Sequence, residues 1–296
     1  MKIKNRKKYT PYFFILPVVI FMVIIFFYPL YLTFKYSLFE TTILNINNKF
    51  IGFNNFLSLL KNADFISTIK KTFQWTFVAL SIKIFLGLFL AIILSKKIKG
   101  IKIYRTLILI PWAIPTTVSA IIWSWIYDGN YGYLNYFLLK FHIISQSISW
   151  LGEKKSAFLC TAFADAWSGI PFVALSLLSG IQAIPESLYE AAKVDGATKL
   201  QIFLKITLPQ LKNLLLVVIT LTFIWTFNSF NTIWLLTKGG PVDSTKTLMI
   251  DIYREAFGSF NVSISSSMSV IVFLILISVS FIYWKITTNN KGVAND

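Results

Sequence analysis

Apolar and polar positions follow one another in long blocks along the chain. Six blocks are almost wholly apolar, and each reaches the roughly 20 residues that a helix needs to cross the hydrocarbon core of a membrane. The predicted spans are residues 12–34, 72–95, 106–127, 157–182, 213–236 and 264–286. We therefore expect an all-α integral membrane protein with six transmembrane helices, in which residues 1–296 form a single transmembrane domain.

The segment between the fourth and fifth spans, residues 183–212, has a different pattern and is called the elbow below. Residues 185–192 favour a short helix that begins with a proline. Asp195 and Gly196 indicate a turn, because glycine accepts the positive φ that ends a helix. A second amphipathic stretch follows and should end or bend at Pro209. The pattern predicts a helix–glycine–helix unit that lies outside the bilayer.

Composition and charge support a membrane protein and orient it. Hydrophobic residues make up 56% of the chain and the mean hydropathy is +0.68, which is too apolar for a soluble domain. The 28 Lys and Arg residues are unevenly placed: 16 lie in the N-terminal tail, the connection after the second span, the elbow and the C-terminal end. The opposite connections hold 11 and are longer. The positive-inside rule therefore predicts that both termini and the elbow are cytoplasmic.

The rarity of some residue types excludes several kinds of chemistry. The chain has one cysteine, Cys160, and one histidine, His142. An intrachain disulfide, a cysteine-built metal site and a histidine-based triad are therefore excluded or very disfavoured. The nucleotide-cradling pattern G-x-x-x-x-G-K-(S/T) does not occur. We expect no catalytic residue, no metal and no cofactor, and hence no enzyme.

Two charged residues lie inside predicted spans, Asp165 in the fourth and Lys83 in the second. A charge at depth costs a few kcal/mol on insertion scales, so each needs a reason. Lys83 could extend to the interface and Asp165 could lie near it; alternatively, Asp165 faces a water-filled path, which we favour. The two could also pair, because their depths differ by about 5 Å at 1.5 Å per residue.

Polar residues recur at helical spacing in the fourth and fifth spans. Asp165, Ser168, Gly169 and Phe172 share one face of the fourth span. Thr222, Thr226 and Ser229 repeat the pattern in the fifth. Hydroxyl groups that bond to carbonyls of their own helix would explain the Ser and Thr residues equally well.

The elbow resembles the EAA loop of ABC-transporter permease subunits, and more narrowly that of the sugar-permease branch that includes the maltose permeases. The matching residues are Tyr189-Glu-Ala-Ala192, Asp195-Gly-Ala197 and Ile206-x-Leu208-Pro209. Further stretches match the same branch in the same order: residues 50–56, 87–91, 104–115, 132–135, 167–172 and 236–241. Asn213 departs from the branch, which often has a proline there.

The resemblance implies the type I ABC importer permease fold and a transport function. The chain would be the membrane-spanning permease subunit of an ATP-driven importer in the bacterial cytoplasmic (inner) membrane. It would pass a carbohydrate inward by alternating access. The implied partners are a second permease subunit, which completes a heterodimer, two ATP-binding subunits and an extracytoplasmic sugar-binding protein, with no nucleic acid. ATP hydrolysis is expected on the partner chains.

The resemblance also implies roles for single residues. In the family the elbow sits in a surface cleft of the ATPase, so the coupling residues would be Glu190, Ala191, Ala192, Gly196, Ile206 and Pro209. Positions that match the sugar site of maltose permeases would form the substrate path: Ser119, Asp165, Ser168, Gly169, Phe172, Thr222, Thr226 and Ser229. Where those permeases have an amide, Asp165 is expected to accept two sugar hydroxyls and to repel anionic substrates.

Two other functions remain open at this point. An ion-coupled secondary transporter would need carboxylates for its coupling ion, and Asp165 is a single one. A membrane enzyme would need clustered His, Cys or carboxylates, which the chain lacks. The sequence does not specify which carbohydrate or polyol is carried.

Overall fold

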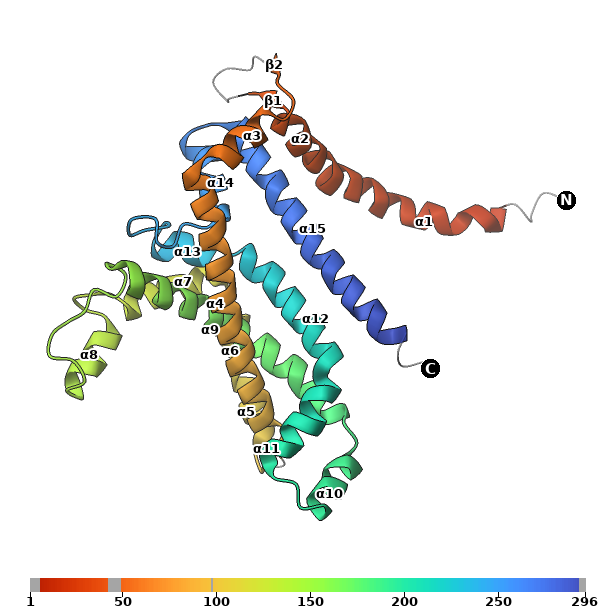
Figure 1. Cartoon of the computed structure of the whole chain (residues 1–296), viewed down its shortest axis with the longest axis vertical. Helices are drawn as coiled ribbons and strands as arrows, with labels where there is room; N and C mark the ends of the chain where they lie inside the picture. The colour runs from red at the N-terminus through yellow and green to blue at the C-terminus, as the bar shows by residue number, and fades with distance from the viewer. Residues whose placement is uncertain (1–5, 42–48, 97, 293–296) are drawn as a thin grey trace. The chain divides into compact units, whose positions relative to one another are not determined.

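The computed structural model describes residues 6–41, 49–96 and 98–292, and most of them are helical. The described chain forms two compact bodies. One contains the part up to Ile66 together with Asp251–Leu274, and the other contains Ser67–Ile250 together with the part from Ile275 onward. Figure 1 traces the chain through both bodies. Each body is described by itself below.

The first body opens with one long apolar helix and a short hairpin. The helix consists of α1 (Arg6–Met22), a π-helical turn (Val23–Phe27) and α2 (Tyr28–Ser37). Strand β1 (Phe39–Glu40) pairs antiparallel with β2 (Lys49–Phe50), and α3 (Asn54–Lys61) follows.

Hydrogen bonds at the end of α2 join three helices of this body. The carbonyl of Ser37 accepts hydrogen bonds from Asn55 Nδ2 at 2.9 Å and from Ser267 Oγ at 3.1 Å. These two donors lie on α3 and on α15 (Val262–Gly292). Polar side chains therefore connect three helices here by satisfying the carbonyl that the end of α2 leaves unpaired.

The second body holds the residues with candidate functions. The π-helical turn Arg254–Gly258 belongs to the first body, and α4, α14 and α15 contribute to both bodies. The helices of the second body have the following bounds: α4 (Ala63–Leu94), α5 (Ile101–Leu107), α6 (Ile110–Ala113), α7 (Thr116–Ile126), α8 (Tyr133–Lys140), α9 (Lys154–Ala183), α10 (Glu186–Val194), α11 (Lys199–Ile202), a π-helical turn (Phe203–Thr207), α12 (Leu208–Phe227), α13 (Asn231–Leu236) and α14 (Leu248–Tyr253).

Helices α4 and α9 approach each other closely through two glycines. A Cβ on Gly87 of α4 would lie 2.5 Å from Cγ1 of Val173, and a Cβ on Gly169 of α9 would lie 2.9 Å from Cε of Lys83. The contacts are reciprocal: each helix places a side chain over the glycine of the other, one turn apart. Small residues allow such close approach between helices in membranes.

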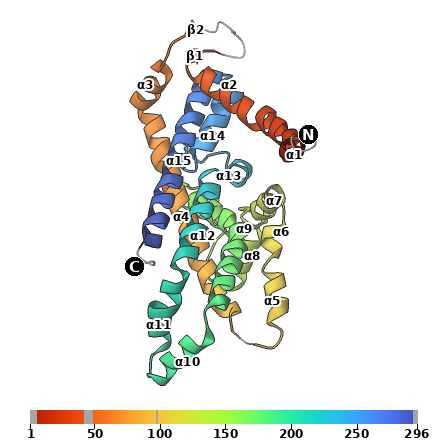
Figure 2. The same cartoon turned by 90° about the vertical axis from the view of Figure 1, so that its right-hand side faces the viewer.

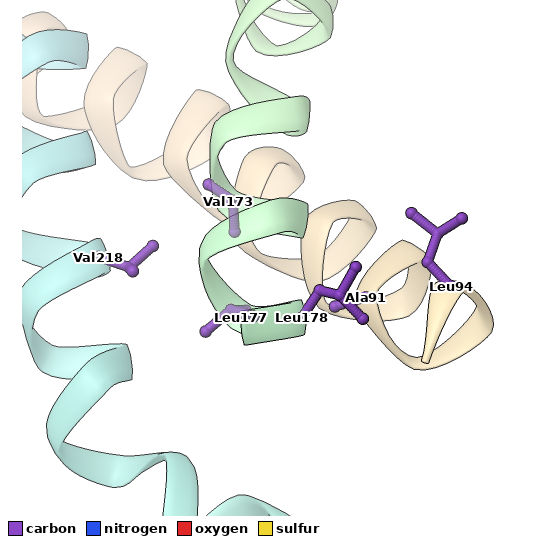
Figure 3. Close-up of a cluster of buried hydrophobic side chains, with 6 residues drawn as sticks. All are labelled: Ala91, Leu94, Val173, Leu177, Leu178 and Val218. Atoms are coloured by element: carbon purple, nitrogen blue, oxygen red, sulfur yellow. The ribbon is translucent and has the colours of Figure 1, made fainter. Parts of the chain in front are cut away.

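Next to this crossing, an apolar cluster that includes Val173 joins α4, α9 and α12. It consists of Ala91, Leu94, Val173, Leu177, Leu178 and Val218 (Figure 3). All six are buried. The cluster joins all three helices, and the glycine crossing joins the two that carry Lys83 and Asp165.

Five described helices are long and apolar enough to cross a membrane: Tyr12–Ser37, Ala63–Leu94, Lys154–Ala183, Lys199–Phe227 and Val262–Thr287. They correspond to five of the six predicted spans. The remaining prediction, residues 106–127, covers two helices rather than one. Ile101–Ala113 and Thr116–Ile126 meet at an angle of 93°, and the described chain has a sixth span only if this pair counts as one.

Proline explains the bend in the third predicted span. Pro115 follows Ile114, whose backbone is extended with φ −76° and ψ 129°. A residue before proline avoids the helical region, and proline itself cannot donate the next helical hydrogen bond. Figure 2 shows α7 turning away from α5 and α6 at this point.

The predicted fifth span, residues 213–236, extends past the C-terminal end of its helix and starts within that helix. The helix starts at Lys199 and ends at Phe227, and α13 is a separate helix. Asn228 ends it, because its Nδ2 donates to the carbonyl of Ile224 at 2.9 Å and satisfies a terminal acceptor. The predicted end or bend at Pro209 became a π-helical turn, Phe203–Thr207, through which the helix continues. The wider turn lies where the proline ring would otherwise meet the carbonyl of Lys205.

Candidate functional site

Four polar side chains from α4, α9 and the end of α12 meet in the interior of the second body. This polar cluster consists of Lys83, Asp165, Thr226 and Ser229. Lys83 Nζ lies 2.6 Å from Asp165 Oδ2 and donates to Thr226 Oγ1 at 2.8 Å. Ser229 Oγ donates to Asp165 Oδ1 at 2.6 Å. Lys83 and Asp165 are 5% and 7% exposed, so the pair is buried.

The ion pair lowers the free-energy cost of placing two charges inside spans. A lone charge at the centre of a membrane costs about 2.5–3.5 kcal/mol on insertion scales. The lysine and the carboxylate cancel each other, and the two hydroxyls satisfy further donors and acceptors. The sequence had suggested both explanations, an ion pair and a path-facing carboxylate. The structure shows the ion pair, in which the Lys83 side chain is buried.

The polar cluster unites three of the eight predicted path residues, Asp165, Thr226 and Ser229. Ser229 lies beyond the end of α12, so it reaches Asp165 through the turn after the helix rather than from the predicted helical stripe. Ser168 Oγ donates to the carbonyl of Asp165 at 2.9 Å, the hydroxyl-to-carbonyl bond within a helix that the sequence also allowed.

The other predicted path residues surround the polar cluster or lie apart from it. Gly169 lies against the stem of Lys83. Thr222 is buried one turn before Thr226, and its hydroxyl has no partner in the described chain. The Phe172 ring packs edge-on against Trp225, with centroids 4.8 Å apart. Ser119 is buried on α7, and no hydrogen bond within the described residues joins it to the others.

The elbow has the predicted helix–glycine–helix form. α10 ends at Val194, Gly196 has a φ of +75°, and Thr198 caps the next helix. Thr198 Oγ1 accepts from the backbone N–H of Gln201, whose Oε1 accepts from the N–H of Thr198 at 2.7 Å. Figure 1 shows α10 at the tip of this unit, between α9 and α11.

A hydrogen bond fastens the two arms of the elbow. The hydroxyls of Tyr189 on α10 and Thr207 in the π-helical turn lie 3.2 Å apart. Among the predicted coupling residues, Glu190, Ala191, Gly196 and Pro209 are exposed, whereas Ala192 and Ile206 are half-buried. The two arms are thus joined by a side-chain contact as well as by the chain between them.

A cavity of about 900 Å³ lies between the elbow and the ends of α4, α5 and α9. Isoleucines of α4, α5 and α9 supply much of its apolar lining. Its charged lining residues are Lys96, Arg105, Lys193, Lys199 and Glu186. No group of three or more His, Cys, Asp or Glu side chains within the described residues is placed to hold a metal ion.

Comparison with known proteins gives relatives along nearly the whole chain. The trehalose/maltose transport system permease protein MalF of Thermococcus litoralis is 35% identical over 288 residues, which is 96% of each chain. The sn-glycerol-3-phosphate transport system permease protein UgpA of Escherichia coli O157:H7 is 31% identical over 277 residues, which is 92% of each.

A solved structure has the same fold. The chain superposes with a TM-score of 0.81 on a chain of a bacterial ABC transporter involved in the import of the acidic polysaccharide alginate. The match covers 96% of this chain and 98% of that one at 21% identity. The fold is therefore that of type I ABC importer permeases.

The model of the family described as binding-protein-dependent transport system inner membrane component matches residues 83–286. This range contains α5 to α14, the elbow and all four members of the polar cluster. The full-length relatives agree with it, so the EAA-loop resemblance is confirmed. The chain belongs to the family of inner membrane permease components of binding-protein-dependent ABC transport systems.

Proposed function

We propose that this chain is the membrane-spanning subunit of an ATP-driven carbohydrate importer that works by alternating access. In this proposal residues 1–296 act as one transmembrane domain with six spans, the bent helix pair counting as one. Both termini and the elbow face the cytoplasm. The chain pairs with a second permease subunit, two ATP-binding subunits and an extracytoplasmic sugar-binding protein, and the partner chains hydrolyse ATP.

The observation that carries the carbohydrate assignment is the match to the trehalose/maltose permease at 35% identity over 96% of the chain. A solved alginate transporter in complex with an alginate pentasaccharide-bound periplasmic protein has a chain of the same fold, with a TM-score of 0.79. These neighbours support a hydroxyl-rich cargo and delivery by a binding protein.

The elbow supports the coupling role. Its two arms are fixed to each other by Tyr189 and Thr207, and each arm continues directly into or from a span. A rigid unit of this kind can transmit a displacement from an ATPase to α9 and α12, which a flexible loop cannot. The proposed coupling residues are Glu190, Ala191, Ala192, Gly196, Ile206 and Pro209.

The eight predicted path residues remain the proposed substrate path, with one change in how Asp165 works. Each of its carboxylate oxygens already accepts one hydrogen bond. A carboxylate has about four lone-pair sites, so each oxygen retains a site for a sugar hydroxyl. Its negative charge is balanced by Lys83, and the expected repulsion of anionic cargo is weakened accordingly.

The function is tested with the complete complex in proteoliposomes. We expect uptake of labelled trehalose to require ATP inside the vesicle and the loaded binding protein outside. Uptake driven by a proton or sodium gradient without ATP would instead support the ion-coupled transporter. Uptake and stimulated ATP hydrolysis are measured side by side, so that a loss of assembly is distinguished from a loss of transport.

A further inference from the structure

Lys83 is held in place by packing as well as by charge. Its stem crosses α9 at Gly169, where an added Cβ would lie 2.9 Å from Cε and 3.0 Å from Cδ. A side chain at position 169 would therefore require the Lys83 stem to shift. The glycine leaves room for the route by which Nζ reaches Asp165.

The Lys83–Asp165 pair is neutral overall and still has hydrogen-bond donors and acceptors that are not used within the polar cluster. A lysine ammonium has three donors, and two of them are used by Asp165 and Thr226. The carboxylate accepts from Lys83 and Ser229 and keeps further lone pairs. The pair thus has at least one donor and one acceptor to spare. A sugar hydroxyl both donates and accepts, so it can use the two together, whereas a carboxylate alone offers only acceptors.

We propose that Lys83 is a positioning and specificity-determining residue of the substrate path: it orients Asp165, cancels its charge and adds a donor beside it, so that a hydroxylated cargo binds the pair. The proposal rests on the proposed transport function, and it assigns to Lys83 a role that the eight path residues did not include. In this proposal Gly169, one of the eight path residues, also leaves room for the stem of Lys83.

The test compares Lys83→Met, Asp165→Asn and the double variant in the complete complex. Lys70→Met is the matched control, because Lys70 is an exposed lysine on the same helix. The first measurement is the yield of assembled complex after detergent extraction. Each single variant leaves an uncompensated or poorly paired buried group and should lower the yield, whereas the double variant removes both charges and should restore it.

The second measurement is trehalose moved per ATP hydrolysed by the assembled complex. We expect the double variant to keep ATP hydrolysis stimulated by the binding protein but to lose about tenfold or more in trehalose moved per ATP. A hydrogen bond to a charged group is worth a factor of this size. Lys70→Met should match the unsubstituted complex in both measurements.

Three outcomes would overturn the proposal. Full recovery of both measurements in the double variant would make the pair a structural tie only. Failure of the double variant to assemble better than either single variant would show that the residues do not act together. Normal behaviour of Lys83→Met would show that the lysine is dispensable. If the unsubstituted complex moves no trehalose, the cargo assignment fails instead, and the assembly measurement alone decides whether the two residues act as a pair.

Discussion

Replacing Gly87 by alanine tests the close approach of α4 and α9. A Cβ at this position would lie 2.5 Å from Cγ1 and 2.6 Å from Cβ of Val173, and 3.2 Å from the backbone nitrogen of Ala174. Ordinary contacts of a Cβ are 3.4–4 Å. The obstacles are a stiff β-branched side chain and a helix backbone, so the helices must move apart.

Two opposing effects set the size of the change in stability that Gly87→Ala causes. Overpacking a well-packed interior typically costs about 1–3 kcal/mol. Alanine in place of glycine within a helix gains up to about 1 kcal/mol in propensity. Because the contact involves Cβ and backbone atoms that cannot rotate away, we expect overpacking to win, with a net destabilisation of about 1–2 kcal/mol. The separation of α4 and α9 should also disturb Lys83, one turn away.

The assay is the loss of folded protein with temperature, followed by size-exclusion chromatography in detergent. A change of 1 kcal/mol corresponds to a shift of roughly 2–4 °C for chains of 150–250 residues. Gly258→Ala is the control, because no atom lies within 4 Å of its added Cβ and its φ is not positive. Adding Val173→Ala to Gly87→Ala should recover part of the loss by removing the Cγ1 contact. If Gly87→Ala were as stable as Gly258→Ala, the close approach of the two helices would be refuted.

Three further predictions follow from other parts of the chain. A cysteine at Lys199 should be labelled only from the cytoplasmic side and a cysteine at Ser244 only from outside; reversed labelling would end the proposed topology. Gly196→Pro should insert normally but abolish transport, because proline cannot adopt the φ of +75° found there; normal uptake at normal abundance would refute the coupling role. The backbone N–H groups of Tyr131 and Asn130 donate to the Asp128 carboxylate and lower its pKa. A lowered pKa means that the stabilisation is present above the pKa of the unfolded chain and is lost as the pH falls through the folded value. Limited proteolysis of residues 128–150 should therefore accelerate in acid, and Asp128→Asn, whose amide oxygen still accepts, should flatten this dependence.

The sequence located the helices better than their ends. Length and hydropathy identified the five described helices that are long and apolar enough to cross a membrane, because the thickness of the bilayer sets the length of such a helix. The bend at Pro115 and the continuation through Pro209 depend on how the chain is held around each proline, and the same residue type gave opposite results. Pro115 forces Ile114 out of the helical region, whereas the π-helical turn before Pro209 accommodates the ring.

The candidate site was predictable to a similar extent. The possible pairing of Lys83 and Asp165 followed from their depths, and the elbow followed from Gly196 and its neighbours. The bonds of Asp165 to Ser229 and of Lys83 to Thr226 could not be predicted, because they depend on where α12 ends and how it packs on α4 and α9. The helical stripe was an unreliable guide at Ser229, which lies beyond the helix.

The glycine crossing and the ion pair are parts of one arrangement. Lys83 and Gly87 lie one turn apart on α4, and Gly169 and Val173 lie one turn apart on α9. Gly87 faces the side chain of Val173, and Gly169 faces the side chain of Lys83. Asp165 lies one turn before Gly169, so the lysine that crosses the glycine arrives at the carboxylate. A buried charge is stabilised when its partner can reach it, and the absence of a side chain at position 169 leaves room for the stem of Lys83. The close packing involves Lys83, Gly87, Gly169 and Val173, and the ion pair involves Lys83 and Asp165. Because Lys83 belongs to both, a change that moves α4 and α9 apart should also weaken the polar cluster.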